Sequence, residues 1–205
     1  ELSEAYKETK TDVDTSLAAN LESTEAKRTE QLETVKTGVD KAIEEYKELG
    51  VEVIVKKVQG YNEEVHLGAI EELKRSGCAA LCLATIDTPK VADKINECQK
   101  LGIKIILVNS DVHNTKKICY VGSDYIKAGK TCAGLLSLIS KQPKLDILVV
   151  TGSKLMCGRR QRIEGFKEEL EALKVDFNIC AQIESNDSDI TAQIETSKYL
   201  KEHKN

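Results

Sequence analysis

EELKRSGCAALCLA, residues 71–84, passes from a charged helical pattern through one glycine into an apolar run. The same order recurs in NECQKLGIKIILVN, residues 96–109, and in EEYKELGVEVIV, residues 44–55. A glycine at this place is typical of a helix stop, because a residue without Cβ adopts the left-handed conformation at no steric cost. We therefore predict that each glycine ends a helix and that a parallel strand begins about two residues later. The three positions are Gly50, Gly77 and Gly102.

The residues around these glycines support helices and buried strands. Thr88 is a suitable N-cap, and the proline that follows it suits the first helical position. The runs at 78–84 and 103–108 are almost wholly apolar, which indicates strands that are buried on both faces in a parallel sheet. The helix between them carries an apolar stripe at three- and four-residue spacing, formed by Val91, Ile95, Cys98 and Leu101.

A second set of alternating elements follows. We predict a short strand at 118–122, a helix at 125–140, a strand at 145–150, a helix ending near 173, a strand at 177–183 and a helix from about 187. This order predicts an α/β fold with doubly wound parallel sheets and right-handed crossovers. Residues 13–19 alternate weakly, so they are either a first strand, which we favour slightly, or part of a polar leader.

Composition restricts the class of protein. The chain has 205 residues, a net charge of −4 and 40% hydrophobic residues, which describes a soluble globular protein without an electrostatic footprint for nucleic acid. Apolar runs all fall short of the roughly 18 residues that span a membrane, and the charged start is unlike a signal peptide. Seven scattered cysteines argue against a disulfide framework and favour the reducing cytoplasm.

Polar residues collect where the predicted strands end, and ligands of open parallel sheets bind at that edge. The candidate loops contain Thr85 and Asp87; Asn109, Ser110 and Asp111; Thr151, Gly152 and Ser153; and Glu184, Ser185, Asn186 and Asp187. For any one of these residues, a role as a helix cap is as good an interpretation as ligand binding. Four such loops together favour a small polar ligand, either uncharged or anionic.

The segment GRRQRIEGF, residues 158–166, places three arginines near the start of a predicted helix. The helix dipole leaves partial positive charge at that end, so acidic residues are the usual choice there. Either the turn is simply solvated, or an electron-rich group lies in front of it. We expect Arg160 to point towards the loops of Asp87, Asn109 and Asp111, and Arg159 to face solvent.

Signatures of enzymes and metal sites are missing from the sequence. Gly152 and Gly158 are one residue too far apart for a phosphate loop, and no Lys-Ser or Lys-Thr pair follows them. Neither a nucleophile elbow nor a metal-binding cysteine pair is found. The histidines show no ligand spacing and are interpreted as surface or loop residues: His66, His113 and His203. We predict no catalytic residue, no metal site and no cofactor.

Three segments together resemble the LacI-type transcriptional regulators and the sugar-binding proteins of the type I periplasmic fold. They are GIKIILVNSD, ICYVGSDYIKAGKTCAGLLSLI and LVVTGSKLMCGRRQRIEGFKEEL, and the resemblance runs from about residue 35 to the end. Two strings sit at the family's mutual distance: V-G-x-D-x-x-x-A-G from Val121, and R-x-R-x-x-G-F from Arg160. The helix and strand at 35–53 look like the family's first helix and second strand.

This resemblance implies two Rossmann-like lobes that close on a ligand, commonly a sugar. The implied divisions are a leader at 1–11, an N-terminal lobe at 12–112 and an incomplete C-terminal lobe at 113–205. The implied ligand-binding residues are Arg160, Asn109, Asp111, Asp87 and Thr85, and the polar loops after the predicted strands add Ser153 and Asn186 as candidates. Arg162, Gly165 and Phe166 look like a structural brace, and Tyr125 like part of the scaffold. Gln31 and Leu32 stand where the family usually has an aromatic residue that stacks on the ligand.

Three functions follow as alternatives. The first is the effector-binding and dimerisation core of a cytoplasmic LacI-type regulator, a homodimer that binds a sugar effector and contacts no membrane. It would bind DNA only through a headpiece that is absent from these residues, so we expect no specific DNA binding by this chain alone. The second is an extracytoplasmic solute-binding protein of a sugar uptake or sensor system. The third, an enzyme that shares only the sheet architecture, is disfavoured by the missing catalytic residues.

Overall fold

The computed structural model describes residues 26, 29–30, 33–34, 36–140 and 142–203. The chain divides into two compact units, of which the first ends at Val55 and the second begins at Lys56. The possible first strand at 13–19 and the predicted positions Gln31 and Leu32 lie outside the described residues. The predicted lobe boundaries at 11/12 and 112/113 stay predictions.

The first unit contains a helix over residues 36–47, and Gly50 follows it with a φ of 77°. The predicted helix stop is confirmed, but the predicted strand is wrong, because residues 51–55 form no strand. A strand is stabilised by hydrogen bonds to a neighbouring strand. No such strand lies beside residues 51–55 in the described part of the chain.

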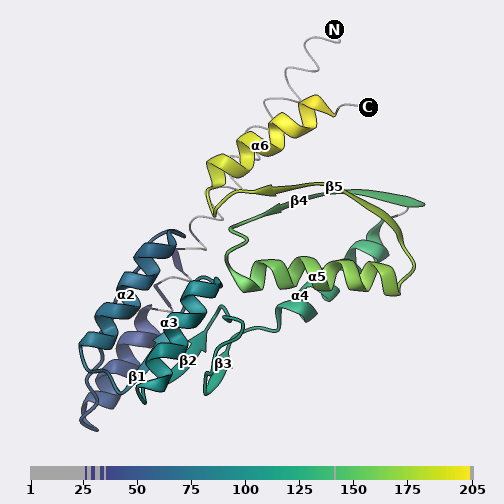
Figure 1. The fold of residues 1–205 in the computed structure, drawn as a ribbon. Helices are drawn as coiled ribbons and strands as arrows, with labels where there is room; N and C mark the ends of the chain where they lie inside the picture. Colours follow the sequence, from purple (N-terminus) through teal and green to yellow (C-terminus); the bar gives the residue numbers. More distant parts are fainter. Residues whose placement is uncertain (1–25, 27–28, 31–32, 35, 141, 204–205) are drawn as a thin grey trace. The chain divides into compact units, whose positions relative to one another are not determined.

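The second unit begins with a three-stranded parallel sheet in the order β1-β2-β3 (Figure 1). Its elements are α2 (Glu63–Arg75), β1 (Ala80–Leu83), α3 (Pro89–Lys100), β2 (Lys104–Val108) and β3 (Cys119–Val121). Gly77 and Gly102 have φ values of 78° and 89°, so both predicted helix stops are confirmed. β2 begins two residues after its glycine, as predicted, and β1 begins three residues after. Thr88 caps α3, since its side chain accepts a hydrogen bond from the Val91 amide.

Among the described residues of this unit, helices α2 and α3 pack on one face of this sheet. Leu81 and Leu107 are buried against helices α2 and α3, whereas Cys82 on the opposite face of β1 is exposed. The prediction of burial on both faces is therefore wrong for β1. Its residues alternate between buried and exposed, because both helices pack on the same face. The core of this half comprises Ile70, Leu81, Leu83, Ile86, Val91, Ala92, Ile95, Cys98, Ile105, Leu107 and Val112.

A two-stranded parallel sheet follows in the same unit. Its elements are α4 (Tyr125–Ile139), β4 (Lys144–Thr151), α5 (Cys157–Ala172), β5 (Asp176–Glu184) and α6 (Asp189–Glu202). The register of β4 and β5 shifts once, between Ile147 and Leu148. Figure 1 shows α4 and α5 on one side of this sheet and α6 on the other. All five predicted elements are found within about two residues of their predicted bounds. The α/β fold with parallel sheets is confirmed.

Helices α4 and α5 cross in close contact at two glycines. A Cβ atom on Gly129 would lie less than 3.0 Å from the Arg162 carbonyl oxygen. A Cβ atom on Gly165 would come equally close to the Ile126 carbonyl oxygen. Both obstacles are backbone atoms, which cannot rotate away as a side chain can. The crossing therefore requires the absence of a side chain on each helix. Among the described helices, none is long and apolar enough to cross a membrane.

Candidate ligand-binding site

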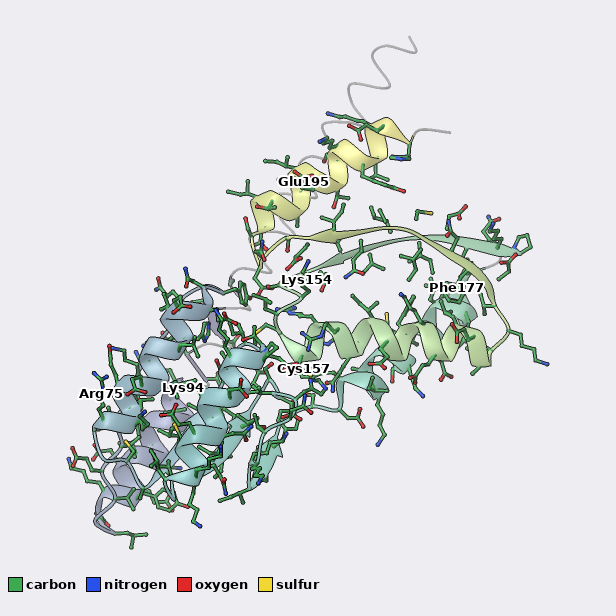
Figure 2. The ribbon with its side chains drawn as sticks, viewed as in Figure 1. Arg75, Lys94, Lys154, Cys157, Phe177 and Glu195 are labelled. Atoms are coloured by element: carbon green, nitrogen blue, oxygen red, sulfur yellow. The ribbon has the colours of Figure 1, made fainter. Side chains whose placement is uncertain are left out.

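The loops after β1, β2 and β4 meet at the beginning of α5, where Figure 2 labels Cys157. The Asp87 amide, in the loop after β1, donates a hydrogen bond of 2.7 Å to the Leu155 carbonyl in the loop after β4. Tyr125 at the start of α4 reaches the loop after β2. Specific contacts therefore join strand ends that belong to two different sheets and lie far apart in the sequence.

Asp87 lies at the centre of these contacts. Its side chain is only 7% exposed, and it forms an ion pair with the Arg160 guanidinium. The His113 amide donates to its Oδ1 at 2.8 Å, and the His113 Nδ1 lies 2.6 Å from its Oδ2. A buried carboxylate is stable only when it is paired in this way. The predicted approach of Arg160 to the Asp87 loop is present in the structure.

Burial of Asp87 acts to raise the pKa of its carboxyl, but the hydrogen bonds from His113 and Arg160 outweigh it, and the pKa lies below its ordinary value. The ionised form therefore stabilises the folded protein. This stabilisation is complete at neutral pH and is lost as the pH falls below about 3.9 through the lower pKa of the folded state. In acid titrations of unfolding, we expect the parent to lose more stability than Asp87→Asn between neutral and strongly acidic pH. A constant difference between the two proteins would contradict this role.

Arg160 keeps donors available for a ligand. Its Nη1 donates to the Lys154 carbonyl at 2.5 Å, and its side chain is 42% exposed. Asn109 and Asp111, the other two predicted partners, are engaged elsewhere. Asp111 forms an ion pair of 2.8 Å with Lys117. The structure thus brings Arg160 together with Asp87 but places no direct contact between Arg160 and these other two residues among its described hydrogen bonds.

Asn109 ends β2 in the left-handed conformation, with a φ of 61°. The Tyr125 hydroxyl lies 2.7 Å from the Asn109 carbonyl oxygen and 2.9 Å from its Oδ1, so it fixes both the backbone and the side chain. A cavity of about 120 Å³ adjoins this residue, lined by Asn109, Ser110, Tyr125, Met156, Gly158, Arg159 and Arg162.

Ser110 is one of the residues that line this cavity, and it carries a buried polar group without a partner. Its side chain is 2% exposed, and its Oγ is the one buried side-chain polar atom of the described residues that lacks a hydrogen-bond partner. Helix α5 begins beside it without a side-chain cap and without an acidic residue in its first turn. An unpaired buried hydroxyl is costly, and an uncapped helix start leaves amide donors free. Both features favour a polar ligand here.

The neighbouring arginines have different roles. The Arg162 guanidinium lies 4.3 Å from the centre of the Tyr125 ring, and this cation–π contact supports the brace that the resemblance implied. Arg159 was expected in solvent, and this is wrong, because its Nη2 donates to Asp187 Oδ1 at 2.7 Å. The Tyr61 hydroxyl donates to the same carboxylate. Gly152 lets Asp187 approach, since a Cβ at this position would collide with the carboxylate.

The remaining predicted residues are not gathered at the cavity. Thr85 is buried, and its Oγ1 lies 3.0 Å from His66 Nδ1. Ser153 is buried beside Glu184, with its Oγ 3.3 Å from Oε1, and Asn186 is exposed with a φ of 51°. These positions neither establish nor remove the predicted contacts with a ligand, which stay predictions.

His66 shows how the sequence interpretation failed for one histidine. It was expected on the surface or in a loop, but it lies within α2 and is 7% exposed. Its Nε2 lies 3.1 Å from the Gly60 carbonyl, while its Nδ1 faces Thr85. The sequence of α2 does not indicate that His66 is buried, because its ring nitrogens face the Gly60 carbonyl and Thr85, which lies 19 positions away.

We expect Thr85→Val to lower the free energy of unfolding by about 1–3 kcal/mol, because it leaves the buried His66 Nδ1 without a partner while preserving side-chain shape. Urea unfolding of the variant against Thr85→Ser, which keeps the hydroxyl, measures this effect. Equal stability of the two variants would show that the Thr85–His66 contact contributes nothing.

Comparison with solved structures gives the same fold from proteins of low sequence identity. A chain of the XylFII–LytSN complex superposes with a TM-score of 0.71 at 23% identity, over 83% of this chain and 61% of that chain. GanP, a glucose-galactose binding protein from Geobacillus stearothermophilus, superposes with a TM-score of 0.70 at 23% identity, over 80% of this chain and 59% of that chain. A Caulobacter myo-inositol binding protein bound to myo-inositol superposes with a TM-score of 0.68 at 20% identity, over 81% of this chain and 56% of that chain.

The chain thus spans about three fifths of the length of the structures that it resembles. No curated protein sequence matches it significantly. A family model described as a periplasmic binding protein domain matches residues 27–205, which is most of the chain. Together with the parallel sheets described above, this match corresponds to the type I periplasmic binding protein fold. The chain belongs to the periplasmic binding protein domain family.

Proposed function

We propose that this chain binds a small sugar or polyol at the loops after β1, β2 and β4, as the ligand-binding domain of a solute-binding protein for sugar uptake or sensing. The observation that carries the proposal is the cavity beside Asn109, where the buried Ser110 hydroxyl has no partner and α5 begins uncapped. Structural neighbours that are named as sugar-binding or inositol-binding proteins support the choice of ligand class.

The polar groups around the cavity suit hydroxyl ligands. A sugar hydroxyl both donates and accepts, so it can satisfy the guanidinium donors of Arg159 and the acceptor oxygens of Asn109, which both line the cavity. Arg160 does not line the cavity, but it offers further donors from its place beside Asp87. The planar guanidinium offers several donors in a fixed fork, which recognises adjacent hydroxyls in one orientation.

The ligand must also compete with contacts that are already present. Arg159 donates to Asp187 and Arg160 pairs with Asp87, so a sugar that takes up either guanidinium replaces an aspartate. A ligand that prefers one arrangement of the loops over another shifts the population towards it.

A screen of pentoses, hexoses, inositols and sugar acids by thermal shift, followed by calorimetry, tests this proposal in the full-length natural protein. We expect at least one neutral sugar or polyol to raise the melting temperature. Ser110→Val, which fills the space beside the Oγ without adding charge, should weaken that ligand by tenfold or more, whereas Ser137→Ala on α4 should not. The absence of any ligand in the screen, or unchanged binding by Ser110→Val, would contradict the proposal.

The effector core of a LacI-type regulator is the second candidate, because all seven cysteines are free and three of them are at least partly buried. Free thiols suit a reducing compartment, and hence a cytoplasmic homodimer that reaches DNA through an additional headpiece. Cell fractionation of the natural protein separates the two candidates. An extracytoplasmic location supports the solute-binding protein, and a cytoplasmic protein that shifts a near-palindromic operator supports the regulator.

A further inference from the structure

Three potential metal ligands converge at the start of α5. Asp87 comes from the loop after β1, His113 from the loop after β2, and Cys157 is the first residue of α5. Their donor atoms all lie within 4.8 Å of one another. The first two residues are 26 positions apart, and the cysteine follows 44 positions after the histidine. Only the folded chain brings them together.

The distances are close to those of a coordinated ion. His113 Nδ1 lies 2.6 Å from Asp87 Oδ2, and Cys157 Sγ lies 3.8 Å from the same nitrogen. Bond lengths of about 2.0 Å to nitrogen and oxygen and 2.3 Å to sulfur place the ligands of a tetrahedral zinc ion about 3.3–3.6 Å apart. The histidine must therefore move less than 1 Å away from the aspartate and slightly towards the thiol. Small side-chain rotations supply such movements.

The donor set selects the kind of ion. One sulfur, one nitrogen and one oxygen suit Zn²⁺, whereas Mg²⁺ and Ca²⁺ prefer oxygen ligands alone. Cys157 is buried and the Asp87 side chain is 7% exposed, but the His113 side chain is 56% exposed, which gives an ion access from solvent. We propose that Asp87, His113 and Cys157 bind Zn²⁺, or a divalent cation of similar softness, with three protein ligands and one position open to water.

Neighbouring groups hold the ligands in place. The Arg160 guanidinium and the His113 amide both donate to the Asp87 carboxylate and restrict its orientation. Residues that hydrogen-bond to metal ligands orient those ligands and change the affinity of the site for the ion. An ionised aspartate and a thiolate supply two negative charges, and Arg160 offsets one of them. With a divalent ion bound, the site therefore carries one net positive charge.

The thiol makes binding dependent on pH. A cysteine coordinates a metal as its thiolate, so binding displaces the thiol proton and the affinity for the ion rises with pH. The charged and titratable groups facing this thiol are Asp87, Asp111, His113, Lys117, Tyr120 and Arg160.

Cobalt and zinc titrations of the full chain test the site, and neither measurement depends on the proposed sugar. We expect Co²⁺ to give a thiolate charge-transfer absorption, and Zn²⁺ to bind one to one. Calorimetry in buffers of different ionisation enthalpy should show release of about one proton. His113→Ala and Cys157→Ser should each weaken Zn²⁺ by at least 100-fold, and Arg160→Gln by about tenfold.

Two controls separate this site from exposed thiols and imidazoles. Cys132→Ser changes an exposed cysteine on α4, and His203→Ala changes the exposed histidine that ends α6. Both should bind Zn²⁺ as the parent does. Since His113 is exposed, His113→Ala preserves the test even if Cys157→Ser unfolds. Absence of stoichiometric Zn²⁺ binding, or unchanged binding by His113→Ala, would overturn the proposal.

Discussion

Arg160→Ala is expected to abolish the thermal stabilisation that a bound sugar gives to the protein. A ligand at one hundred times its Kd stabilises the folded state by about 2.7 kcal/mol, and this contribution disappears when binding is lost. Arg160 is a suitable determinant, because it keeps exposed donors at the site although it pairs with Asp87. Thermal shift and calorimetry with a ligand found in the screen measure the effect.

The ion pair with Asp87 requires a control for folding. Removal of Arg160 leaves a buried carboxylate with His113 as its other partner, and we expect the unliganded protein to lose about 1 kcal/mol, since the guanidinium is partly solvated. Asp87→Asn in the same background should recover part of that loss but no sugar binding. Arg160→Lys should restore charge without the fork and bind only weakly. If Arg160→Ala bound the sugar as the parent does, Arg160 would be a solvated surface residue without a role in binding.

Gly165→Ala is expected to lower the free energy of unfolding by about 3 kcal/mol. The new methyl group would lie less than 3.0 Å from the Ile126 carbonyl oxygen, and the two helices would have to separate. Overpacking in a close contact costs about 1–3 kcal/mol when side chains can adjust, and this obstacle is backbone. Chemical denaturation of the variant and the parent measures the difference.

Gly134→Ala is the matched control for this substitution. Gly134 also lies in helix α4, but a Cβ atom there meets nothing within 4 Å. Alanine favours the helix over glycine by about 1 kcal/mol, so this variant should be at least as stable as the parent. If both substitutions changed stability equally, helix propensity rather than the crossing would explain the result.

The fold follows from local signals wherever those signals involve backbone conformation. Gly77 and Gly102 end helices because each adopts a positive φ, and Thr88 caps α3 as its position predicts. The interpretation failed where a distant partner decides the outcome. Residues 51–55 have the composition of a strand but no described neighbour, and β1 is covered on one face because of where α2 and α3 pack. An apolar run reveals burial but not how many faces are covered.

The site was predictable in part for the same reason. Polar residues follow both β1 and β4, so the approach of Arg160 to the Asp87 loop was expected, although the two strands belong to different sheets. The pairing of Arg159 with Asp187 depends on the space that Gly152 leaves, and the approach of His113 to Cys157 depends on the conformation of two loops. Neither arrangement produces a recognisable pattern in the sequence. Arg159 and Asp187 lie 28 positions apart, and His113 and Cys157 lie 44 positions apart.

The crossing of α4 and α5 also limits how ligand preference can be changed by mutation. The crossing fixes Tyr125 against α5, and the Tyr125 hydroxyl in turn fixes Asn109. Substitutions at the crossing would therefore alter selectivity without touching a ligand, and they would do so unpredictably. Directed evolution of a new preference should hold Gly129 and Gly165 constant and diversify the loops instead. Libraries that respect this constraint should retain a larger fraction of folded members.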